Sequence, residues 1–144
     1  GDVLRSICVL LVAACGMAAS AQADETNDSK IAVELNKLES NGSGCQPYLV
    51  FENKTDIDFG SLKLDLVMFD VDGIIARRVA VEGAPLPPGK MAVKVFDLPD
   101  LACDQIGRVL LNGLTQCTGQ EGDQSDCLAL IDTASRASNV GFIQ

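Results

Sequence analysis

The sequence has no histidine in its 144 residues. A chain without histidine cannot form the Ser/His or Cys/His pairs that activate many enzymatic nucleophiles. It also has no C-x-x-C pair, so the usual spacings of a zinc site are missing. No glycine-rich loop precedes a helical segment, which argues against a phosphate-binding loop. We therefore expect no enzymatic activity and no cofactor.

The N-terminal region has the pattern of a signal peptide. An apolar run at 7–19 follows a basic residue, and Ala21 and Ala23 fit the A-x-A rule of cleavage. We predict a signal peptide at 1–23 and one domain at 24–144, which is long enough for a single core. The run is short for a membrane span, so we expect a soluble product in the periplasm or outside the cell.

The same region allows a second interpretation. The stretch "VAAC", residues 12–15, resembles the lipobox of bacterial lipoproteins, in which the cysteine becomes the lipidated first residue. A lipid at Cys15 would anchor the protein to a membrane surface. Soluble release and lipid anchoring are both open on the sequence.

The charge balance indicates which classes of partner the protein can attract. Asp and Glu number 20 against 11 Lys and Arg, and the net charge is -9. Nucleic acids and anionic membranes attract patches of Lys and Arg, so this balance argues against both. The expected partner is another periplasmic protein or a component of the cell envelope.

Short segments with a period of two follow the signal peptide. The clearest is "SLKLDLVMF" at 61–69, in which apolar residues alternate with Lys63 and Asp65. Comparable patterns, bounded by turn residues, predict further strands at 30–38, 45–53, 74–81, 90–98, 106–117 and 137–144.

One segment departs from this pattern. The stretch "SDCLALIDTAS" at 125–135 predicts a short helix capped by Ser125 or Asp126. The predicted fold class is mainly β, an immunoglobulin-like antiparallel β-sandwich with a short C-terminal helix.

Four cysteines follow the predicted cleavage site, an even number in a protein expected to reach an oxidising compartment: Cys45, Cys103, Cys117 and Cys127. Four cysteines allow three pairings. In an immunoglobulin-like order, the strands that begin near 45 and 106 lie in facing sheets and run in the same direction. We therefore predict the disulfides Cys45–Cys103 and Cys117–Cys127 at opposite ends of the sandwich.

The stretch "LVMFDVDG" at 66–73 resembles the first motif of haloacid dehalogenase-like hydrolases. That resemblance implies Asp70 as nucleophile and Asp72 as general acid/base, and it gives the alternative function of a small phosphatase-like hydrolase. The family pattern continues with Thr, whereas this chain has Ile74. Asp72 and Gly73 between alternating strands instead predict a tight hairpin, with glycine at positive φ.

A metal site is not predicted. Asp56, Asp58, Asp70 and Asp72 could share a calcium ion only if the bend before the 61–69 strand met the turn after it. The two pairs flank opposite ends of that strand.

The stretch "LKLDLVMFDVDG" also resembles the signature of FxLYD-type domains, which are small extracytoplasmic β-sandwiches, and "YLVFENKTDIDF" matches their preceding strand and bend. From Val33 to Arg108 the chain is similar to uncharacterised secreted proteins of alphaproteobacteria, some labelled as Tat-signal proteins. The shared stretches are "VELNKLE", "LDLVMFDVDG", "PLPPGK" and "ACDQIGRVLLN". The resemblance implies a sandwich and brings no established activity. The predicted function is therefore a non-enzymatic module that binds a protein or an envelope component through a sheet edge or face.

Overall fold

The structure is a computed structural model that describes residues 15–16 and 29–144. The predicted signal peptide at 1–23 and its cleavage site lie outside the described residues, apart from Cys15 and Gly16. Cys15 is exposed and forms no disulfide. No helix within the described ranges is long and apolar enough to cross a membrane.

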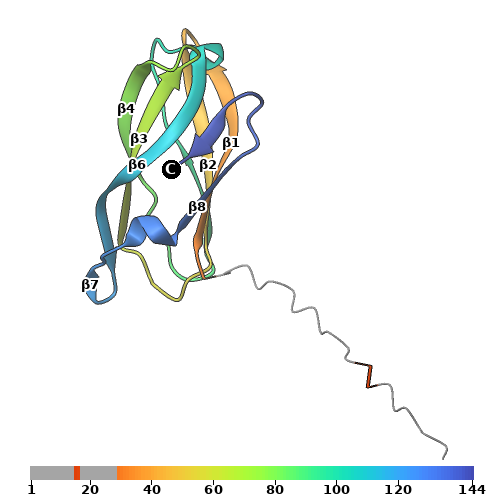
Figure 1. Ribbon diagram of the computed structural model, residues 1–144. Coiled ribbons are helices and arrows are strands. Elements are labelled where there is room, and N and C mark those ends of the chain that lie inside the picture. The colour runs from red at the N-terminus through yellow and green to blue at the C-terminus, as the bar shows by residue number, and fades with distance from the viewer. Residues whose placement is uncertain (1–14, 17–28) are drawn as a thin grey trace, which may run out of the picture.

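Two β-sheets pack face to face (Figure 1). The first sheet has the strand order β5-β2-β1-β8. Its strands are β1 (Ile31–Asn41), β2 (Gly44–Asn53), β5 (Met91–Val95) and β8 (Ile131–Ser135). The second sheet has the order β4-β3-β6-β7, and β9 also pairs with β6. Its strands are β3 (Ser61–Asp70), β4 (Ile75–Glu82), β6 (Ile106–Gly119), β7 (Gly122–Asp123) and β9 (Gly141–Ile143).

The mainly β, two-sheet prediction is confirmed. Neighbouring strands are antiparallel except for two pairs, β1 with β8 and β6 with β9, which are parallel. After β6 the chain adds β8 to the first sheet and β7 and β9 to the second, and β8 and β9 form the two parallel pairs.

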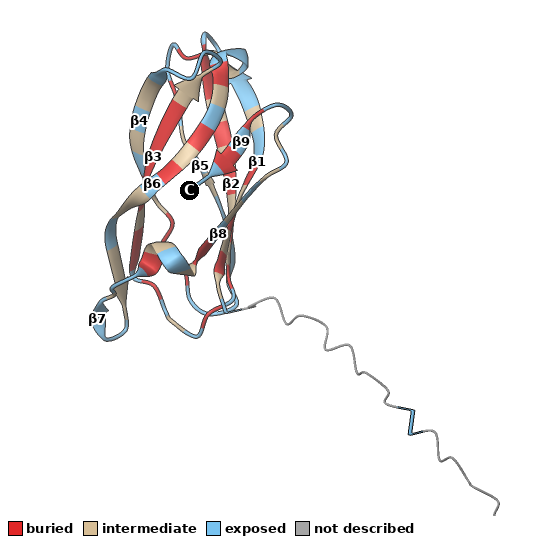
Figure 2. Ribbon diagram, viewed as in Figure 1, coloured by how far each residue is buried: buried red, intermediate tan, exposed pale blue. Residues whose placement is uncertain are grey.

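The core lies between the sheets and follows the alternation of the sequence. The apolar residues of β3 at 62, 64, 66 and 68 are fully buried, as their shared face predicts. Ile31, Val33 and Leu35 of β1 approach the same core from the first sheet. Figure 2 shows buried segments on both sheets, whereas β4 is mostly intermediate or exposed.

The predicted helix at 125–135 is wrong. Only Cys127–Leu130 forms a helical turn, a 3-10 helix called η2, and Ile131–Ser135 is strand β8. Asp126 stands before η2 with φ +59 and makes no side-chain cap. Because Ile131 is buried and pairs with Ile31 along the edge of β1, tertiary pairing outweighs the local helical preference.

Two disulfides join the predicted cysteine pairs. Cys45 at the start of β2 is bonded to Cys103, which lies in a 3-10 turn before β6, called η1 (Cys103–Gln105). Cys117 near the end of β6 is bonded to Cys127 of η2. The starts of β2 and β6 therefore share one end of the sandwich, as the predicted strand directions require.

The two long sides of the sandwich differ. On one side β8 of the first sheet contacts β9 of the second, so the returning chain closes the gap between the sheets. On the other side each sheet ends in an edge strand, β5 in the first sheet and β4 in the second. We call this second side the open side of the sandwich.

Candidate functional site

The Asp70–Ile74 turn joins β3 to β4. The Asp70 Oδ1 atom accepts hydrogen bonds from the backbone N–H groups of Asp72 and Ile74, both at 2.9 Å. Gly73 adopts φ +80, which confirms the predicted positive-φ position. The Asp70 carboxylate therefore caps the turn. One oxygen of the Asp70 carboxylate is therefore hydrogen-bonded to the turn itself.

The surroundings of the two aspartates also differ from the resembled hydrolase motif. The nucleophile strand of that family lies in a parallel sheet, whereas β3 is antiparallel to both of its neighbours. Asp58 precedes β3 and Asp72 follows it, and ten residues of strand span about 30 Å. Within 15–16 and 29–144, no group of three His, Cys, Asp or Glu side chains is placed to hold a metal ion.

A polar cluster that sequence reasoning missed lies on the outer face of the second sheet. Asp65 of β3 is only 7% exposed, although its alternation with buried leucines predicts a solvated side chain. Arg78 of β4 donates two hydrogen bonds to the Asp65 carboxylate, and Asn112 of β6 donates a third. These hydrogen bonds, first those of Arg78 and then that of Asn112, lower the pKa of Asp65 from 3.8 to about 2. Because every carboxylate oxygen is engaged, the cluster fastens three strands together.

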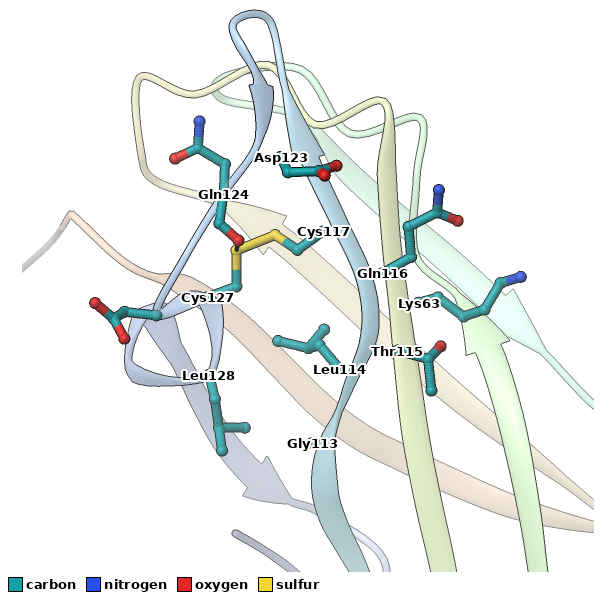
Figure 3. A pocket seen from close by; sticks show the side chains of 11 residues that line it. Lys63, Gly113, Leu114, Thr115, Gln116, Cys117, Asp123, Gln124, Cys127 and Leu128 are labelled. Atoms are coloured by element: carbon teal, nitrogen blue, oxygen red, sulfur yellow. Dashed lines mark hydrogen bonds between the residues drawn. A yellow bond between two sulfur atoms is a disulfide. The ribbon is translucent and has the colours of Figure 1, made fainter.

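A groove of about 800 Å³ lies beside the Cys117–Cys127 disulfide (Figure 3). Its charged lining residues are Lys63, Asp123 and Asp126. Their side chains form no ion pair or hydrogen bond with one another in the described structure.

The most unusual surface is strand β5. Met91, Val93 and Val95 alternate along the strand and are 57%, 59% and 46% exposed. We call these three residues the β5 strip. Large apolar side chains in a row on an edge strand are a feature that natural sheets usually avoid, because such edges pair with other chains.

The backbone of the same three residues is also free. Asn53 N donates to Lys90 O at 2.9 Å, and Phe96 N donates to Pro47 O at 3.3 Å. The backbone N–H and C=O groups of Lys90 and Phe96 therefore point toward β2. Backbone direction alternates along a strand, and the residues of the β5 strip therefore direct their N–H and C=O groups away from β2. The strip offers three donors and three acceptors along an unpaired edge.

Apolar side chains of β2 extend the strip across the outer face of the first sheet. Val50 lies opposite Val93, and Tyr48 lies opposite Val95. At the other end Glu52 lies opposite Met91 and gives the surface a polar boundary. The apolar surface thus continues from the edge onto Val50, and at Tyr48 it meets the Lys37 Nζ atom, which lies 4.4 Å from the ring centroid.

Comparison with known proteins supports the fold. No protein-family model matches the chain, and no curated protein matches it significantly. Among solved structures, the fold is similar to that of IrmA from Escherichia coli, with a TM-score of 0.50 and 14% sequence identity. The similarity covers 72% of this chain and 90% of the IrmA chain. At this identity the likeness concerns the fold alone.

Proposed function

We propose that this chain is an exported, non-enzymatic β-sandwich module that binds an extended segment of another extracytoplasmic protein along β5. The observation that carries the proposal is the β5 strip, in which free backbone groups and exposed apolar side chains belong to the same three residues. An added strand would satisfy the backbone groups and cover the side chains at once, which is how β-augmentation works.

The same proposal includes export to the periplasm and an immunoglobulin-like strand order. Two disulfides and the signal-peptide pattern at 1–23 support an oxidising compartment. The order β5-β2-β1 opposite β4-β3-β6, with chain crossings between the sheets, supports the immunoglobulin-like class. Membership in the secreted alphaproteobacterial family rests on the stretches quoted from the sequence. Intact-mass analysis of the exported protein tests the start at Asp24 against a lipidated Cys15.

The second edge on the open side is better protected than β5. Arg78 of β4 is bonded to Asp65, and Glu82 accepts hydrogen bonds from Ser61 and Leu62. A register shift also interrupts the pairing of β4 with β3 near the hairpin. Such a bulge protects an edge strand from pairing with another chain, and no register shift interrupts the pairing of β5 with β2. We therefore assign binding to β5.

The alternative of a phosphatase-like hydrolase that uses Asp70 and Asp72 has less support. The Asp70 carboxylate caps its turn, and within the described residues neither aspartate forms an ion pair or belongs to a candidate metal cluster. Phosphatase turnover that is lost in Asp70→Asn would restore this alternative.

A pair of proline variants tests the assignment to β5. Val93→Pro blocks the edge, yet it removes an N–H that makes no bond within the sheet. Ala80→Pro is the matched control, because Gly83 N donates to Leu62 O at 2.8 Å and the alternation from Gly83 directs the Ala80 N–H away from β3. Both variants place one proline at an outward position of an edge strand on the open side.

The assay is crosslinking of the mature, tagged protein to extracytoplasmic proteins of the cells that produce it, with mass spectrometry of the products. We expect an adduct through the outer face of the first sheet that is lost in Val93→Pro and kept in Ala80→Pro. An adduct that survives Val93→Pro, or one that is lost equally in both variants, contradicts binding at β5. Thermal melting of each variant confirms that the fold is intact.

A further inference from the structure

Basic residues are concentrated on the open side of the sandwich. Residues 73–96, which include β4 and β5, hold four basic side chains, Arg77, Arg78, Lys90 and Lys94, and one acidic side chain, Glu82. This segment has a net charge of +3, whereas the whole chain has -9, so the remaining residues carry -12. The exposed apolar edge of β5 therefore lies in a basic segment of an acidic protein.

Two of these cations face the gap between the sheets. Lys94 pairs with Leu49, and Arg77 pairs with Met68, and both partners are buried in the core. Pairing residues share a face of their sheet, so Lys94 and Arg77 emerge on the inner side of the two edges. The Arg77 Nη2 atom donates to Pro99 O at 2.7 Å, which brings the guanidinium from β4 to the loop that follows β5.

Three of the four basic residues of this segment have no carboxylate partner within the described part of the chain. The ion pairs there join Lys30 to Asp132, Lys37 to Glu39, Arg78 to Asp65 and Arg136 to Glu34. Lys90, Lys94 and Arg77 are in none of them. Their charge is available to a molecule that approaches the open side.

We infer that the segment bound at β5 is an acidic strand in which apolar residues alternate with Asp or Glu; this inference rests on the function proposed above. Side chains of an added strand alternate between the two faces of the sheet. Those on the outer face lie beside the β5 strip and are apolar. Those on the inner side lie near Lys94 and Arg77 and are acidic, since cross-strand neighbours of opposite charge stabilise a sheet.

A second copy of this chain fits the same edge poorly. If β5 paired with itself around Val93, the two Lys94 side chains would lie on one face as diagonal neighbours, about 7–8 Å apart. The two Arg77 side chains would add further positive charge on that face. The occupant is therefore a segment of a different protein.

Short peptides test this chemistry directly. The probes are a labelled seven-residue peptide in which Val alternates with Glu, and its counterpart in which Lys replaces Glu. Binding to the mature protein is measured by fluorescence anisotropy, and the site is located from the backbone amide shifts of β5 by NMR. We expect the Glu peptide to bind about tenfold more tightly than the Lys peptide, and to lose affinity when salt rises to about 0.5 M.

Charge reversal provides the matched comparison. Lys94→Glu is expected to weaken binding of the Glu peptide and to strengthen binding of the Lys peptide. Lys63→Glu makes the same change of charge on β3 in the second sheet and is expected to leave the preference unchanged. A preference that shifts equally in both variants contradicts a local role of Lys94.

The outcomes separate this inference from the proposed function. If both peptides bind with equal affinity and Val93→Pro abolishes the binding of both, the edge binds strands and the acidic preference is wrong. If neither peptide binds, the acidic strand is rejected, and binding at β5 is decided by the crosslinking assay. Concentration-dependent dimers that disappear in Val93→Pro would identify a second copy as the occupant and overturn the inference.

Discussion

Arg78 holds Asp65 through a two-pronged contact across neighbouring strands. Its Nε atom donates to Oδ1 at 2.8 Å, and its Nη2 atom donates to Oδ2 at 2.6 Å. Arg78 pairs with Val67, which lies two residues beyond Asp65 on the same face of β3. The contact between Arg78 and Asp65 is therefore diagonal. Together with Asn112, the guanidinium gives both oxygens of this largely buried carboxylate a hydrogen-bond donor.

This contact makes stability depend on pH. The pKa of Asp65 falls from 3.8 to about 2 in the folded protein, so the folded state binds fewer protons at acidic pH. Asp65 therefore contributes stability above about pH 4, and the contribution is lost as the pH falls through 2. A shift of this size corresponds to about 2 kcal/mol.

We expect Asp65→Asn to lower the free energy of unfolding by about 2 kcal/mol at pH 7, with a difference from wild type that shrinks toward pH 2. Urea unfolding between pH 7 and 2 measures the difference. Asp72→Asn is the control, since no hydrogen bond to its side chain is present in the described structure. A constant difference for Asp65→Asn across this range would show that the contact does not set the pH dependence.

Gly73 is expected to tolerate no β-branched residue. Its φ of +80 is strained for any L side chain, although an added Cβ meets no atom within 4 Å. Gly73→Val should reduce the free energy of unfolding by more than about 1 kcal/mol. Gly113 has equally open surroundings and no positive φ, so Gly113→Val isolates the effect of the backbone. Equal melting temperatures for the two variants would contradict the assigned turn.

Asp70 is expected to act as a turn cap. Asp70→Ala removes an oxygen that accepts two backbone hydrogen bonds and should cost about 1 kcal/mol of stability. Asp70→Asn keeps an oxygen at this place and should change stability by less than about 0.5 kcal/mol. Thermal unfolding of the two variants distinguishes them, and equal losses would show that charge, instead of the acceptor, is what matters.

The strands were predictable where alternation and burial agree. Leu62 and Leu64 of β3 follow the expected face, and Gly73 follows from turn chemistry. Asp65 was not predictable as a buried residue, because its partners Arg78 and Asn112 lie on two other strands, β4 and β6, and are brought to it by strand pairing. An alternating pattern shows that two faces differ and does not show which face meets the core.

Strand β5 illustrates that limit. Its pattern of Met91, Val93 and Val95 against Ala92 and Lys94 is that of a strand with an apolar inner face. In the structure the apolar face is the outer one. The register with β2 decides this, and register depends on how the whole sheet assembles. Assembly of the sheet also decides β8, because its local pattern favours a helix and its pairing with β1 makes it a strand.

The two disulfides differ in the length of chain that they close. Cys45–Cys103 spans 58 residues and Cys117–Cys127 spans 10. On the chain-entropy model the longer loop stabilises the protein by about 4 kcal/mol and the shorter by about 3. The Cys45–Cys103 bond also lies at the junction of β2 with β6, where Cys45 is buried.

We therefore expect the double variant Cys45→Ala/Cys103→Ala to lose more stability than Cys117→Ala/Cys127→Ala. Urea unfolding of each variant, with the other bond intact, measures both losses. Non-reducing peptide mapping of the wild-type protein is the control on the pairing. A linked peptide with Cys45 and Cys117 would contradict the strand directions, because these cysteines lie near opposite ends of strands that run the same way. An equal loss in the two variants would instead show that burial and loop length do not govern these bonds.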